Sequence, residues 1–84
     1  MRISKKTREQ AALMCQVRAS QWASGDAPDI SGTAEMLGLE RESEDLARAA
    51  FVTANSGNLD GGWRFCVEEW AEAEAMLRTG WSPT

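Results

Sequence analysis

Residues 63–80, WRFCVEEWAEAEAMLRTG, decide the fold class of this chain. Apolar side chains recur there at spacings of three and four residues, which is the period of an amphipathic helix. These side chains are Trp63, Cys66, Val67, Trp70, Ala73 and Leu77. Gly80 is typical of the left-handed residue that ends a helix. We therefore predict a helix that begins at Asp60 or Gly62 and ends at Thr79.

Three more helices are predicted upstream, over Thr7–Ser24, Ser31–Leu37 and Ser43–Asn55. Thr7 and Ser31 are expected to cap the first two, because a hydroxyl at the start of a helix accepts a free backbone N–H. No stretch alternates polar and apolar residues long enough to predict a strand. The 84 residues therefore predict a single all-α domain, a compact bundle of about four helices of which the second is short.

The first predicted helix is apolar in more than one direction. Its main face is Ala11, Ala12, Cys15, Ala19, Trp22 and Ala23, whereas Leu13, Met14 and Val17 point elsewhere. Such a helix is usually central in a bundle or shared with a second chain, so a homodimer through this helix is a further prediction. The third helix is expected to bury Leu46, Ala47, Ala50, Phe51 and Ala54.

Charge is unevenly distributed along the chain. The net charge is −4, but residues 1–8 carry four cations and no acid, whereas residues 9–84 carry five arginines and thirteen acids. The expected molecule has an acidic body and a basic N-terminal segment, residues 1–6, that frays. An acidic body repels nucleic acid and favours basic protein partners. No apolar run is long enough to span a membrane and no signal peptide is recognisable, so the chain is expected to be cytoplasmic.

Histidine is missing from the sequence, and the two cysteines, Cys15 and Cys66, belong to no CxxC pair. Most zinc sites and the histidine-dependent nucleophile pairs need those residues. We therefore predict no metal, no cofactor and no catalytic residue, and a protein that is not an enzyme. Both cysteines lie in apolar stripes, where they are expected to pack as small hydrophobic side chains; a redox or disulfide role is the alternative.

Carboxylates are concentrated in two segments, and two tryptophans lie near predicted helix ends. One acidic segment opens the third helix, and the other is predicted on the solvent side of the last helix, opposite its tryptophans. Together they could form an anionic surface that imitates nucleic-acid phosphates or docks on a groove rich in lysine and arginine, although solvation alone is the simpler interpretation. One of the two tryptophans could anchor an interface. The candidate partner-binding residues are Glu40, Glu42, Glu44, Asp45, Glu68, Glu69, Glu72, Trp22 and Trp81.

A second interpretation comes from residues 33–39, TAEMLGL, which are similar to the middle of a helix-turn-helix. There a small residue and a later glycine permit the tight turn between two helices. Ala34 and Gly38 fit this pattern. Glu44 does not, because it occupies the position where a branched apolar side chain is expected, and the acids around it would face phosphates unfavourably. A helix-turn-helix DNA-binding regulator is therefore the alternative function.

Residues 70–83, WAEAEAMLRTGWSP, and residues 8–15, REQAALMC, resemble parts of short uncharacterised reading frames of tailed bacteriophages. The resemblance covers about a third of the chain and brings no assigned catalytic residue with it. It implies a phage accessory protein that works in the bacterial cytoplasm. Small acidic phage proteins of this kind often bind and block a host protein, as anti-CRISPR proteins do. The expected function is therefore non-enzymatic binding to a host protein with a basic surface, as an inhibitor of host defence such as an anti-CRISPR protein.

Overall fold

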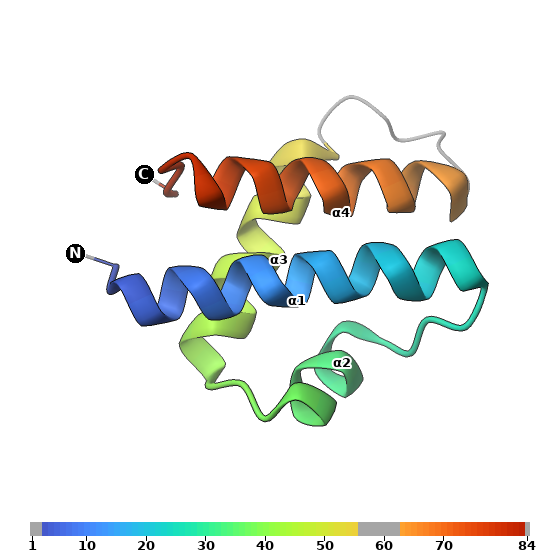
Figure 1. Cartoon of the computed structure of the whole chain (residues 1–84), viewed down its shortest axis with the longest axis horizontal. Coiled ribbons are helices and arrows are strands. Elements are labelled where there is room, and N and C mark those ends of the chain that lie inside the picture. Colours follow the sequence, from blue (N-terminus) through green and yellow to red (C-terminus); the bar gives the residue numbers. More distant parts are fainter. Residues whose placement is uncertain (1–2, 56–62, 84) are drawn as a thin grey trace.

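The computed structural model describes residues 3–55 and 63–83, with side chains from residue 66 onward in the second range. It contains four helices, α1 (Lys5–Ser24), α2 (Ile30–Leu37), α3 (Arg41–Ala54) and α4 (Trp63–Arg78), shown in Figure 1. The described residues contain no strand. The predicted all-α class and the short second helix are confirmed. None of the described helices has the length and apolar character needed to cross a membrane.

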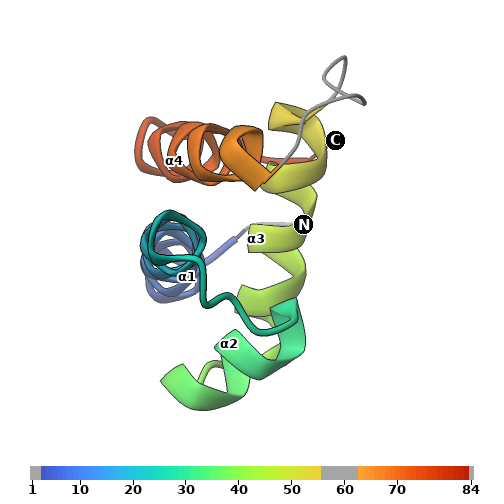
Figure 2. The same ribbon diagram turned by 90° about the vertical axis from the view of Figure 1, so that its right-hand side faces the viewer.

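The four helices form two layers. Helices α1 and α4 run antiparallel side by side, and α3 crosses behind both of them (Figure 1). The short α2 packs beside α1 and α3 at the opposite end of α3 from α4 (Figure 2). Helix α1 therefore contacts each of the other three helices. This central position accounts for its apolar residues in several directions.

The core consists largely of alanines, which let the helix backbones approach closely. Ala11 and Ala12 in α1, Ala47 in α3 and Ala73 in α4 are all at most 1% exposed. Larger buried side chains fill the remaining space, namely Met14, Cys15, Leu46, Trp70 and Leu77. The prediction for α3 is confirmed, with Phe51 only half-buried. The predicted buried face of α1 is wrong for Ala23, which is exposed. It also left out Met14, which is completely buried.

Helices α1 and α2 begin earlier than predicted because different residues cap them. Ser4 Oγ accepts the backbone N–H of Thr7 at 3.1 Å. Asp29 Oδ1 accepts the N–H of Gly32 at 2.7 Å. In an N-cap, the side-chain oxygen of the residue before the helix accepts a free backbone N–H in the first turn, here three residues later. The predicted caps Thr7 and Ser31 therefore lie inside the first turns of their helices.

Helix α3 begins at Arg41, two residues before the predicted start at Ser43. Ser43 is completely buried and its hydroxyl donates to Gln10 Oε1 of α1 at 2.7 Å. That hydroxyl is thus occupied in a contact between helices and does not cap. Glu40 precedes the helix without a side-chain cap. The start of α3 is therefore fixed by packing on α1, which no capping pattern reveals.

The predicted helix ends at glycine are confirmed for α2 and α4. Gly38 follows α2 at φ 67° and Gly80 follows α4 at φ 105°, both in the left-handed region. The Trp81 N–H donates to the Met76 carbonyl at 2.9 Å, so the chain turns back onto the last helical turn. Residues 56–62, which include the predicted starts of the last helix at Asp60 and Gly62, lie outside the described residues.

The Asp29 cap gives a test of local stability. Asp29→Ala is expected to lower the free energy of unfolding by about 1 kcal/mol, because the Gly32 N–H loses its acceptor. Chemical denaturation followed by circular dichroism measures the change. Asp26→Ala is the matched control, because Asp26 is exposed in the same connection and makes no described side-chain hydrogen bond. Equal effects of the two substitutions would contradict the capping role.

Candidate functional site

The first acidic segment lies at the start of α3. Glu40, Glu42 and Asp45 are exposed there, and Glu44 is half-buried. Carboxylates in the first turn of a helix are favoured by the helix dipole, so their position also has a local structural cause. Exposure of three of them over less than two turns nevertheless gives α3 an anionic tip, in which only Glu42 forms no ion pair with a described residue.

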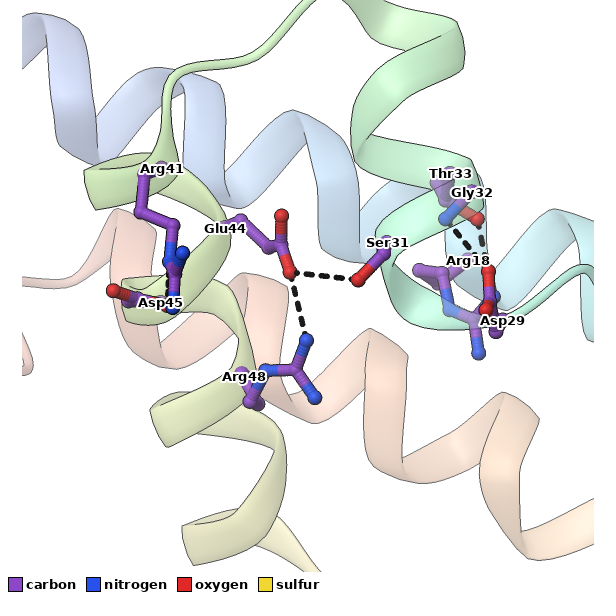
Figure 3. Close-up of polar contacts among 9 residues, drawn as sticks. All are labelled: Arg18, Asp29, Ser31, Gly32, Thr33, Arg41, Glu44, Asp45 and Arg48. Carbon is purple, nitrogen blue, oxygen red and sulfur yellow. Dashed lines mark hydrogen bonds and ion pairs between the residues drawn. The ribbon is translucent and has the colours of Figure 1, made fainter.

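Glu44 has a structural role that the sequence pattern did not reveal. Its carboxylate accepts from Arg48 at 2.7 Å and from the Ser31 hydroxyl at 3.2 Å, as Figure 3 shows. Its side chain is only 16% exposed. Because Ser31 lies in α2, these bonds hold the start of α3 to α2. Glu44 therefore contributes less to an outward-facing surface than its position in the sequence indicates.

The other ion pairs of this segment are exposed and weak. Lys6 Nζ lies 3.7 Å from Glu40 Oε1, and Arg41 Nε lies 3.6 Å from Asp45 Oδ1. Exposed pairs of this kind contribute about 0–1 kcal/mol, because water and salt screen them. A partner's lysine or arginine can therefore replace either cation at small cost. Glu42 makes no ion pair with any described residue.

The second acidic segment, on α4, is only partly as predicted. Glu68 and Glu72 are exposed, but Glu69 is 4% exposed, so its expected place on the solvent side is wrong. Burial raises the pKa of the Glu69 carboxyl, and the carboxylates of Glu72 and Glu68 raise it further. The cause is visible in the spacing, because Glu69 lies three residues after Cys66 and four before Ala73, on the packed face of α4.

The two acidic segments do not form one surface. The acidic residues of α3 lie at its start, whereas α4 packs near the other end of α3 (Figure 2). A typical protein interface covers about 800 Å² of each partner. The whole molecule exposes 5306 Å². An interface of that size covers only a small part of the exposed surface, and the two segments are separate candidate surfaces.

Neither candidate tryptophan is a freely exposed anchor. Trp22 and Trp81 are both half-buried and pack against the core. Trp81 lies over the end of α4, where its carbonyl accepts from Arg8. Trp22 borders two open hollows, of about 480 and 470 Å³, near the connection between α1 and α2. Trp63 was predicted to lie in the core, but its side chain is not among those that the structure describes.

The basic N-terminal segment is partly built into the fold. Arg8 donates to the carbonyls of Leu77 and Trp81, at the end of α4 where the helix dipole favours a cation. Lys5 and Lys6 lie in the first turn of α1, so they belong to the helix and not to a frayed end. Residues 1 and 2 lie outside the described residues.

Arg18 is a buried cation that the sequence pattern did not single out. It is 4% exposed and donates to Thr33 Oγ1 at 3.1 Å (Figure 3). It also donates to the Pro28 carbonyl. Burial lowers the pKa of its guanidinium, and the nearby Asp29 carboxylate opposes that effect. Since Pro28 and Thr33 flank the start of α2, Arg18 attaches that helix to α1.

An aromatic stack continues this cluster into the other helices. The Arg18 guanidinium carbon lies 5.1 Å from the centroid of the Trp70 ring, within the range of a cation–π contact. The Trp70 ring stacks on Phe51 with centroids 4.0 Å apart. One buried cluster thus joins residues from all four helices. These contacts between helices make the cluster a centre of stability. Because the cluster is buried, a dissolved ligand has little access to it.

The two cysteines are free thiols in different surroundings. Cys15 is completely buried, which raises the pKa of its thiol to about 12; the Glu74 carboxylate adds to the rise. Cys66 is half-buried. The described residues include no group of three side chains among histidine, cysteine, aspartate and glutamate that could hold a metal ion.

Thiol labelling separates the two cysteines. The thiolate is the reactive form, and at pH 8 only about one Cys15 thiol in ten thousand is ionised. We therefore expect an aromatic disulfide reagent to modify one thiol of the native protein quickly, at Cys66, and Cys15 only after unfolding. Peptide mapping by mass spectrometry identifies the labelled residue. Rapid labelling of Cys15 in the native protein would contradict its burial in the core.

Comparisons of this chain with models of known protein families, with curated proteins and with solved structures give no match.

Proposed function

We propose that this chain is a small non-enzymatic accessory protein of phage origin that binds a host protein with a basic surface. The proposed role is inhibition of host defence, as anti-CRISPR proteins inhibit it, in the bacterial cytoplasm. The observation that carries the binding proposal is the anionic tip of α3, where Glu40, Glu42 and Asp45 are exposed together. Phage origin rests on the resemblance of residues 8–15 and 70–83 alone.

The electrostatics of the body favour a basic partner. Residues 9–84 carry thirteen acids against five arginines, so the field of the molecule attracts cationic proteins. Complementary charge raises association rates and rejects partners of the same sign. Because the ion pairs at the tip of α3 are exposed, their carboxylates remain available to a partner.

Charge reversal tests the proposal. Tagged protein is incubated with a bacterial host lysate, and the recovered proteins are identified by mass spectrometry. We expect a partner that wild-type protein retains and that Glu42→Lys with Asp45→Lys loses. The matched control is Glu68→Lys with Glu72→Lys, which changes the net charge equally at exposed positions of α4.

Three outcomes would contradict this proposal. One is recovery of no partner, and another is equal loss with both double variants, because net charge alone would then explain binding. In the third, only the α4 variant loses the partner, which would move the interface to Glu68 and Glu72. Circular dichroism of each variant confirms that its helices are intact.

The helix-turn-helix regulator remains the second candidate function, because one observation favours it. Three residues, 38–40, join α2 to α3, and the left-handed Gly38 gives the tight turn that this motif needs. The exposed carboxylates of α3 oppose it, since they would face DNA phosphates. A gel-shift assay at low salt decides between the two, and retention of a duplex would favour the regulator.

The proposed homodimer through α1 rests on Leu13. This side chain is 42% exposed, whereas most other large apolar side chains of α1 pack within the chain itself. We expect light scattering at high protein concentration to give a dimer mass that Leu13→Glu reduces to a monomer mass. Ser20→Glu, on the same exposed face, is the control for added charge. A monomer mass for the wild-type protein would contradict this proposal.

A further inference from the structure

A groove lies beside the anionic tip of α3. It has a volume of about 480 Å³ and runs between the start of α1, the first turns of α3 and the segment after α4. Ile3, Leu46, Ala49 and Pro83 supply its apolar lining. Leu46 is 5% exposed and belongs to the core, whereas Ile3 and Ala49 are half-buried. The floor is therefore continuous with the core, and the rim is open to solvent.

The charge on this groove has one sign. Glu42 and Asp45 line it, and none of its described lining residues is a cation. Glu42 has no ion-pair partner among the described residues, and the pair of Asp45 with Arg41 is exposed. A smaller hollow that also borders the start of α1 has the opposite character, with Lys5, Arg8 and Arg78 against Glu9. The negative charge is thus a local property of the groove.

We propose that this groove receives a short segment of the partner protein that carries an apolar side chain between lysines or arginines. This proposal deepens the proposed function and rests on it. The apolar side chain would cover Ile3 and Ala49, because burying apolar surface is favourable. The flanking cations would pair with Glu42 and Asp45, which fixes the register of the segment. Hence the groove selects for sequence, whereas the anionic tip alone selects only for charge.

Peptide titration tests this inference without the natural partner. The probe is the amidated hexapeptide KKLLKK, added to ¹⁵N-labelled protein and followed by amide NMR spectra. We expect saturable shifts at Ser4, Thr7, Asp45 and Ala49, next to the groove. The peptides KKSSKK and EELLEE are expected to bind at least about tenfold more weakly, since each lacks one of the two interactions. Equal binding of KKSSKK would overturn the proposal, because charge alone would then explain the shifts.

Two variants locate the site independently. Ala49→Trp fills the groove and should abolish the shifts, whereas Ala71→Trp places the same ring on the exposed side of α4 and should leave them intact. Glu42→Gln with Asp45→Asn keeps the shape of the groove and should weaken KKLLKK at least about tenfold. Unchanged binding by either groove variant, or shifts confined to α4, would overturn the inference.

The two proposals fail separately. If the lysate partner is lost with Glu42→Lys and Asp45→Lys but bound normally by Ala49→Trp, the binding function holds and the groove inference falls. If no host protein is recovered but KKLLKK binds in the groove, the chemistry of the groove holds and the host-protein function falls.

Discussion

Trp70→Ala is expected to lower the free energy of unfolding by about 3–5 kcal/mol. Trp70 is 1% exposed and is the largest fully buried side chain among the described residues. Its ring stacks on Phe51 and lies under the Arg18 guanidinium, so truncation removes contacts to two other helices as well as a large buried volume. A domain of this length has a total stability of about 4–13 kcal/mol, so the variant should be marginally folded.

Urea denaturation followed by far-ultraviolet circular dichroism measures this effect without relying on tryptophan fluorescence. Trp70→Phe keeps a stacking ring and should lose substantially less stability. Trp81→Ala removes a half-buried tryptophan near a helix end and is expected to cost less than Trp70→Ala. A loss below about 1.5 kcal/mol for Trp70→Ala would show that the stack is not the centre of the fold.

Arg18→Ala is expected to destabilise the protein by about 3 kcal/mol. The substitution leaves the Pro28 carbonyl and Thr33 without their donor and opens a space beside Trp70. Thr33 is completely buried, so its hydroxyl oxygen bears a desolvation cost when it loses its charged donor. Because Arg18 attaches α2 to α1, its loss should also increase amide hydrogen exchange in residues 30–37 more than in α4.

Arg18→Met separates packing from charge. Methionine restores most of the apolar contact, and buried charges are often replaceable by apolar side chains of similar volume. We therefore expect Arg18→Met to lose clearly less stability than Arg18→Ala. Equal losses would assign the effect to the hydrogen bonds alone, and negligible losses in both variants would contradict a structural role for Arg18.

The helices themselves could be predicted because their periodicity and their terminal glycines are local properties of the sequence. Trp70, Ala73 and Leu77 follow the period and are all buried, and Gly38 and Gly80 end their helices as expected. The starts of the helices were less predictable. Two residues fit a cap near the start of α1, Ser4 and Thr7, and two near the start of α2, Asp29 and Ser31. Which of them caps depends on how far packing extends the helix.

The burial of Arg18 and Glu69 was not predicted, because arginine and glutamate side chains usually stay in water. Arg18 lies three residues after Cys15 and Glu69 four before Ala73, so both occupy buried faces by the same period that identified the apolar residues. A buried arginine needs partners from elsewhere in the chain, here Pro28 and Thr33, and single-sequence patterns do not reveal such partners. The spacing alone indicates that both side chains are buried.

The candidate site could be predicted as a list of residues but not as a surface. The exposed acids at the tip of α3 were found, whereas the division between α3 and α4 depends on how the helices pack. The groove beside Glu42 is lined by residues far apart in the sequence, namely Ile3, Pro83 and residues of α3. Such long-range proximity leaves no periodic signal in the sequence.

Hydrogen exchange of the free and partner-bound protein tests the central claim most directly, namely that the anionic tip of α3 binds a basic protein. The measurement uses the unmodified chain with the protein recovered from the host lysate. The account predicts that binding slows exchange in residues 3–7 and 40–49 and leaves residues 68–75 unchanged. Protection confined to residues 68–75, or no protection of α3 in a complex shown to form, would contradict it.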